Sequence, residues 1–137
     1  MVIWITGKAS AGKTTLANKL KNEIGSNAVI LDADNVRKIF GRFVTYYKYT
    51  NKDRYLHQQN MAIIAVILEE QGYLPIIACV SPERKVRKEF CRYFKEVKLY
   101  YVTGGFLWEG TTYEEPDEEE LAEIIHGNEI LDLIKAN

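Results

Sequence analysis

The 137-residue sequence has little cysteine, little proline and no excess of either charge. Its two cysteines, Cys79 and Cys91, form no CxxC pair and have no histidine at ligand spacing. This argues against a zinc site and favours reduced thiols in a cytoplasmic protein. Eighteen basic and 19 acidic residues give a net charge of −1, which favours neither nucleic acid nor an anionic membrane as partner.

Long apolar runs are also absent. The N-terminal run, Val2–Thr6, has only four to five apolar residues before a glycine and no basic residues ahead of it. We therefore expect neither a signal peptide nor a membrane span. The length and the 47% hydrophobic content are those of one globular domain spanning residues 1–137.

Short apolar runs alternate with helical patterns along the chain. The expected strands are Val2–Thr6, Ala28–Leu31, Leu74–Val80 and Val97–Val102. The expected helices are Thr14–Ile24, Val36–Phe40, Lys52–Gln71 and one that begins at Ser81-Pro82-Glu83 with Ser81 as N-cap. This order predicts an α/β fold of three layers, α/β/α, around a mostly parallel sheet of four to five strands.

Three segments are less regular. Phe43–Thr50 has the composition of a strand but fits an exposed aromatic loop equally well, and residues 103–117 form an irregular loop. The tail from Glu118 is expected to be mostly helical with a break near Gly127, and Leu121–Ile125 is an alternative fifth strand.

Polar residues follow three of the expected strands at the points where they end: Gly7–Lys13, Asp32–Asn35 and Ser81–Arg84. Ligands of parallel α/β sheets bind beyond the carboxyl ends of the strands. The sequence therefore predicts one site at this edge of the sheet.

The first of these segments reads GxxxxGKT. It comprises Gly7, Lys8, Ala9, Ser10, Ala11, Gly12, Lys13 and Thr14, with Thr15 next. Such a loop points backbone N–H groups at phosphate oxygens, and the following helix directs its positive N-terminus at the same anion. Lys13 is expected to reach the β- and γ-phosphates of ATP, and the Thr14 hydroxyl to bind Mg²⁺.

Other P-loop classes fit less well. A GTPase needs a DxxG and an NKxD motif, but no DxxG is present and Arg54 follows Asn51-Lys52-Asp53 where the last aspartate belongs. A motor-type ATPase needs an acidic pair after an apolar strand, yet Leu74–Val80 runs into Ser81-Pro82. A kinase for a small molecule remains, because such kinases place a carboxylate at the end of the second strand.

Several motifs in this order resemble the adenylylsulfate kinases: GKTTLA, LDADNVR, Asp53-Arg54, VSPERKVR and a late Tyr-Glu-Glu-Pro. The resemblance runs from Val2 to about Val102 and resumes near Tyr113. It implies transfer of the ATP γ-phosphate, with Mg²⁺, to the ribose 3′-hydroxyl of adenosine 5′-phosphosulfate or to a similar nucleotide-like acceptor.

The resemblance also implies residue roles. Asp32 and Asp34 match carboxylates near Mg²⁺ and the acceptor hydroxyl, and either can orient that hydroxyl or accept its proton. The matches for contacts to the acceptor are Arg37, Arg54, Ser81, Arg84 and an aromatic wall at Phe40 or Phe43. Simpler structural roles are a helix N-cap for Asp32 and a basic helix face for Arg84 and Arg87.

The sequence departs from the family in two places. Where the family has an asparagine and paired arginines that grip the phosphosulfate, this chain has His57, Gln59 and Asn60. Residues 103–117 replace a long basic lid and contain neither Lys nor Arg. A cation from a partner subunit in a homodimer, or a hydrophobic flap of Phe106 and Trp108, are two ways to compensate.

These departures leave alternatives open. One is a kinase for another nucleotide conjugate or a small alcohol, and another is a regulatory module that binds ATP with low turnover. His57, His126 and Cys79 are interpreted as packing or surface residues.

Overall fold

The computed structural model describes residues 1–44 and 49–130. A five-stranded, fully parallel sheet forms its centre, in the order β2-β3-β1-β4-β5. The strands are β1 (Val2–Thr6), β2 (Ala28–Asp32), β3 (Leu74–Ala78), β4 (Val97–Thr103) and β5 (Glu123–His126). The helices are α1 (Lys13–Ile24), α2 (Ala33–Phe40), α3 (Asn51–Glu70) and α4 (Arg84–Cys91), with a 3₁₀ turn at Glu118–Glu120. The predicted three-layer fold is confirmed.

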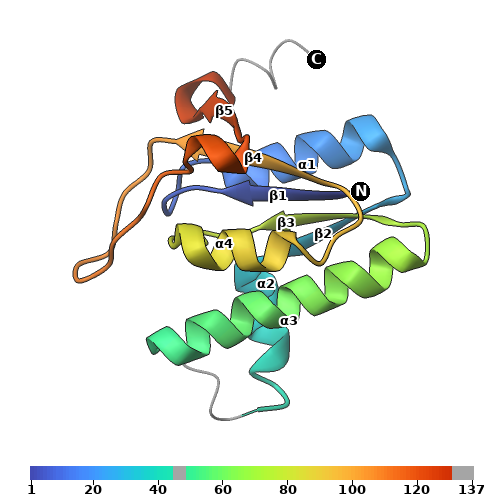
Figure 1. Ribbon diagram of the computed structural model, residues 1–137, viewed down its shortest axis with the longest axis horizontal. Helices are drawn as coiled ribbons and strands as arrows, with labels where there is room; N and C mark the ends of the chain where they lie inside the picture. The colour runs from blue at the N-terminus through green and yellow to red at the C-terminus, as the bar shows by residue number, and fades with distance from the viewer. Residues whose placement is uncertain (45–48, 131–137) are drawn as a thin grey trace.

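Alternation along β1 produces the two faces of the sheet. Val2 and Trp4 belong to the core cluster that includes residues of α2, α3 and α4, whereas Ile3 and Ile5 belong to the cluster that includes residues of α1. Helix α1 covers one face of the sheet, and α3 and α4 cover the other (Figure 1). Every residue of β1 is buried, as expected for the central strand of a parallel sheet. Both faces of the sheet are therefore covered by helices. This leaves the carboxyl ends of the strands as the place where a ligand can bind.

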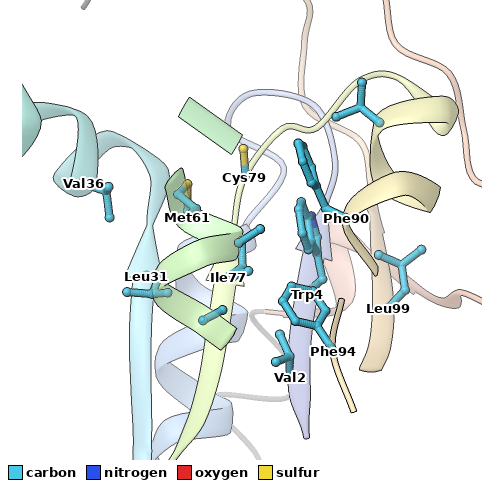
Figure 2. Packing of buried hydrophobic residues seen from close by; sticks show 13 residues of the cluster. Val2, Trp4, Leu31, Val36, Met61, Ile77, Cys79, Phe90, Phe94 and Leu99 are labelled. Carbon is cyan, nitrogen blue, oxygen red and sulfur yellow. The ribbon is translucent and has the colours of Figure 1, made fainter. Parts of the chain in front are cut away.

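Trp4 organises the core under α4. Its ring lies 6.1 Å from the Phe94 ring, centroid to centroid, and Phe90 and Leu99 belong to the same cluster (Figure 2). Its indole Nε1 donates a 3.1 Å hydrogen bond to the Ser81 hydroxyl. A core residue of β1 thus holds the loop that follows β3, which is one of the three predicted site segments.

Two sequence expectations about α4 and the tail are wrong. The helix begins at Arg84 instead of directly after Ser81, because Ser81 has a left-handed backbone (φ 43°) and its hydroxyl is bonded to Trp4. The stretch Glu123–His126 is strand, not helix, because it pairs in parallel with the open edge of β4. The alternative expectation of a fifth strand near Leu121–Ile125 is therefore confirmed. Helical backbone follows at residues 127–130.

Of the aromatic segment Phe43–Thr50, residues 45–48 lie outside the described part, and the described ends, Phe43 and Tyr49, are exposed and outside any strand. The tail residues 131–137 are likewise outside it. Within the described ranges, no helix has the length and apolar character needed to cross a bilayer.

Candidate active site

The carboxyl ends of β1, β2 and β3 open into a cleft of about 830 Å³. Residues 103–117, here named the lid segment, leave the sheet on the same side as the carboxyl end of β1 (Figure 1). A smaller recess of about 190 Å³ adjoins the cleft, and Asp34, Arg54 and Trp108 line both. The cleft reaches Lys13 and Thr14, whereas the recess lies toward α3. We name these the phosphate side and the acceptor side.

The phosphate side is built on the glycine-rich loop between β1 and α1. Gly12 precedes α1 with φ 112°, a backbone that a side chain would strain, and added Cβ atoms there would also meet Ile130 at 2.8 Å. Lys13 Nζ donates a 2.6 Å hydrogen bond to the carbonyl of Lys8 across the loop. Burial lowers the pKa of Lys13, although Cys79, Asp34 and Asp32 oppose the shift. A phosphate anion would stabilise this ammonium group further.

Asp32 connects the loop with α2. Its Oδ1 accepts hydrogen bonds from the backbone N–H groups of Asp34 (3.1 Å) and Asn35 (3.4 Å), so it is the N-cap of α2. Its Oδ2 accepts a 2.6 Å hydrogen bond from the Thr14 hydroxyl. Asp32 is therefore the helix N-cap that the sequence analysis offered as its simpler role. Its other carboxylate oxygen, Oδ2, bonds to the Thr14 hydroxyl.

This hydroxyl and carboxylate form an oxygen donor pair suited to Mg²⁺. Magnesium in kinase sites takes one or two protein oxygens and completes its shell with water and substrate phosphates. Among the described residues no group of three or more His, Cys, Asp or Glu gathers at one point, so a metal cage of protein ligands is not formed there. The residues present fit a metal shared with a nucleotide.

The acceptor side combines α2, α3 and the loop after β3. Arg37 lies 4.4 Å from the centroid of the Tyr49 ring and lines the recess with Arg54 and Ser81. His57 and Gln58, at helical spacing from Arg54, line it too and are buried. The burial of His57 agrees with its interpretation as a packing residue, whereas the sequence analysis did not single out Gln58. The three- and four-residue spacing from Arg54 was the available signal.

His57 is held neutral in this position. Its Nε2 lies 2.9 Å from the Ala33 carbonyl, which joins α3 to the start of α2. Burial, reinforced by the nearby Arg37, lowers its pKa to about 4. The position therefore contributes a polar but uncharged group.

Three predicted acceptor residues lie elsewhere. Phe40 packs on the core cluster and does not line the cleft or the recess. Arg84 donates from Nε to the Glu115 carbonyl at 2.6 Å, outside both cavities. Phe43 is exposed and lines neither. The structure therefore brings together Asp34, Arg37, Arg54 and Ser81 from the predicted acceptor set.

Arg87 is not on a basic helix face, as the sequence alternative had it. It is completely buried and forms a salt bridge with Glu120, with its Nε 2.8 Å from Oε1. It also donates to the carbonyls of Ser81 (2.6 Å) and Glu114 (2.8 Å). Arg87 thus ties the loop after β3 to the end of the lid segment.

The lid segment is joined to the phosphate loop by backbone contacts. Phe106 N donates a 3.0 Å hydrogen bond to the Ala9 carbonyl, and the two residues form an antiparallel bridge. A Cβ on Gly105 would overlap the Ala9 oxygen, so only glycine permits this approach. Phe106 and Trp108, edge to face at 5.0 Å, line both the cleft and the recess. The segment supplies aromatic surface where the sequence has no cation.

Cys79 is a wall residue of the cleft. It is buried, and burial raises the pKa of its thiol. The group is protonated at neutral pH, in agreement with its interpretation as a packing residue.

A parallel sheet, a GxxxxGKT loop and an adjacent carboxylate define the class: this is a protein with the P-loop NTPase fold. A family model described as adenylylsulphate kinase matches residues 1–104. The chain belongs to the adenylylsulphate kinase family.

Named relatives agree with this assignment. The chain is 37% identical over 90 residues to an adenylyl-sulfate kinase of Paraburkholderia xenovorans (strain LB400), covering 64% of this chain and 49% of that protein. It is 36% identical over 108 residues to a probable adenylyl-sulfate kinase of Pyrococcus abyssi (strain GE5 / Orsay), covering 72% and 58%. The chain thus spans about half the length of the curated relatives it matches.

The solved APS kinase CysC of Mycobacterium tuberculosis, a cysteine-to-alanine mutant, shares the fold. The TM-score is 0.75 at 19% identity, with 98% of this chain and 96% of that chain covered. At this identity the likeness concerns the fold alone.

Proposed function

We propose that this protein is a phosphotransferase that moves the γ-phosphate of ATP, with Mg²⁺, to a hydroxyl group of a nucleotide-like acceptor such as adenylylsulfate. The observation that carries the proposal is the Thr14–Asp32 hydrogen bond of 2.6 Å, with Asp34 in the same cleft. A hydroxyl and two carboxylates around one space support the proposed roles of Thr14 and Asp32 toward Mg²⁺ and of Asp34 toward the acceptor. Family membership and the phosphate loop support the same reaction.

Different residues of the chain serve the phosphate donor, the metal and the acceptor in this reaction. The loop amides and Lys13 bind the β- and γ-phosphates, and Thr14 with Asp32 would hold Mg²⁺, which neutralises charge on the transferring phosphoryl group when bound. Asp34 faces the acceptor side, where its carboxylate can orient the hydroxyl or take its proton at Oδ. Arg37 and Arg54 bind the acceptor. Phe106 and Trp108 would exclude water from the cleft.

An acceptor panel tests the proposal. Protein is incubated with ATP-Mg²⁺ and adenylylsulfate, other nucleotide conjugates or small alcohols, and ADP and the phosphorylated product are measured. We expect acceptor-dependent ADP with at least one nucleotide-like compound. Asp34→Asn should lower kcat by about 10²-fold or more while ATP affinity stays within about twofold. Equal turnover by Asp34→Asn would contradict the assigned role.

A second candidate function is favoured by the lid segment, which contains no Lys or Arg. In that case the chain binds ATP as a regulatory module with low turnover, since a cation at the transferring phosphate can contribute about 10³-fold or more. ATP binding without turnover on any acceptor, in the monomer or in a homodimer, would select this alternative.

A further inference from the structure

Gln58 carries a buried oxygen atom that has no hydrogen-bond partner among the described residues. The residue is 6% exposed and lies on α3, one turn after Arg54. Its Nε2 donates to the Arg54 carbonyl at 3.4 Å, whereas its Oε1 is buried and unpaired. Buried side-chain oxygens are nearly always bonded, so an unpaired one in a cavity wall indicates a missing donor.

The orientation of this amide follows from its neighbour. If the Gln58 amide were rotated by half a turn, its oxygen would face the Arg54 carbonyl oxygen and two acceptors would oppose each other. The hydrogen bond to the carbonyl therefore directs the NH₂ group toward Arg54 and leaves the oxygen without a partner. The available atom requires an O–H or N–H donor.

Gln58 lies in the wall of the recess where we propose that the acceptor binds. Gln58 lines the recess together with Arg37, Arg54 and Ser81, but it does not line the part of the cleft that contains Lys13 and Thr14. The neighbouring His57 already uses Nε2 at the Ala33 carbonyl. The recess is therefore lined by two arginine cations and by a glutamine whose buried amide oxygen has no partner.

We propose that Gln58 determines acceptor specificity by accepting a hydrogen bond from a hydroxyl or N–H group of the acceptor. The inference rests on the proposed function and narrows its acceptor class. An ionised phosphosulfate group against this oxygen would bring only lone pairs, leaving both sides unpaired. The recess therefore favours a donor-bearing group at this point over a fully ionised one.

Binding measurements with matched probes test the proposal independently of turnover. The phosphate side is first filled with AMPPNP-Mg²⁺, and calorimetry then compares compounds that differ in one donor. The pairs are adenosine 5′-phosphoramidate with adenosine 5′-monophosphate, adenosine with purine riboside, and adenosine with 2′-deoxyadenosine. We expect wild-type protein to prefer the donor-bearing member of at least one pair by about tenfold. Gln58→Met, similar in volume, should reduce that preference to about twofold or less.

Two variants make the result specific. Gln59→Met changes the same residue type one position along α3, where the side chain lines a different groove with Ile63 and Tyr93, and it should bind all probes like wild type. Gln58→Leu also removes the acceptor oxygen and should lose the preference in the same way, which covers the case in which Gln58→Met unfolds at a lower temperature.

The outcomes separate this inference from the proposed function. Absence of any preference in wild type, or a preference that survives in a folded Gln58→Met variant, overturns the role of Gln58. Absence of ADP formation with every acceptor overturns the kinase proposal instead, and leaves the binding comparison intact.

Discussion

The phosphate side takes its groups from one continuous stretch, residues 7–15, plus Asp32, whereas the acceptor side takes them from α2, α3, the loop after β3 and the lid segment. On the phosphate side the proposed ligand contacts come mainly from backbone N–H groups, so the spacing of two glycines and a lysine is sufficient to predict this side. On the acceptor side single side chains from distant segments meet, and each depends on separate packing. The phosphate side is thus formed mostly by neighbouring residues in the sequence, whereas the acceptor side is formed by residues from distant segments.

The two sides also differ in how they are held. The phosphate loop is stabilised by its own helix and by the Lys13 bond to the Lys8 carbonyl. The acceptor side depends on the buried Arg87, which binds the Ser81 carbonyl and Glu120. Substitutions far from the cleft should therefore disturb the acceptor side more than the phosphate side. Three predictions test this comparison.

The largest effect is expected on the phosphate side. Lys13→Met removes the ammonium group that we propose contacts the β- and γ-phosphates, and should lower kcat/KM by about 10³-fold. The unfolding free energy should change little, because burial without ligand disfavours this charge. Steady-state ADP release and urea unfolding measure the two quantities. If Lys13→Met kept wild-type turnover, the proposed role of Lys13 in binding the phosphates would be wrong.

The next effect is expected in the support of the acceptor side. Arg87→Met leaves the buried Glu120 carboxylate without its cation, although the Asp117 N–H still donates to it, and should lower the unfolding free energy by about 3 kcal/mol. Lys98→Met is the matched control, because Lys98 and Glu123 form an exposed pair whose loss costs less than about 1 kcal/mol. Urea unfolding compares the two variants. Equal losses would show that Arg87 is not a buried anchor.

The smallest effect concerns His57 and pH. Because its pKa is lowered to about 4 in the folded protein, the unfolded chain takes up a proton below the ordinary value of 6.5 while the folded one does not. Stability from this residue is therefore complete above about pH 6.5 and is lost as the pH falls toward 4. Between about pH 7.5 and 5 the loss should be about 2 kcal/mol.

Unfolding measured across this pH range checks the prediction. His57→Gln can still donate to the Ala33 carbonyl and should show a flatter pH dependence than wild type. His126→Gln, at an exposed histidine bonded to Thr103, should keep the wild-type dependence. An unchanged slope in His57→Gln would contradict a neutral buried imidazole.

Sequence reasoning succeeded where a property is local. The strands β1 to β4 and helices α1 to α3 appear close to the expected ranges, because apolar periodicity and a following glycine are read within a few residues. It failed for Ser81, where a good N-cap residue bonds to Trp4 instead, and for Glu123–His126, where an open sheet edge converts an expected helix into a strand. Both failures come from partners more than twenty residues away.

By itself, the sequence determined the phosphate loop, the order of strands and helices, and the carboxylates at the end of β2. Only the tertiary structure decided that Arg87 is a buried anchor, that Arg84 lies outside the cleft, and that His57 and Gln58 line the recess. The physical reason is that a backbone cradle is specified by neighbouring residues. The environment of a side chain, in contrast, is specified by whatever the fold places against it.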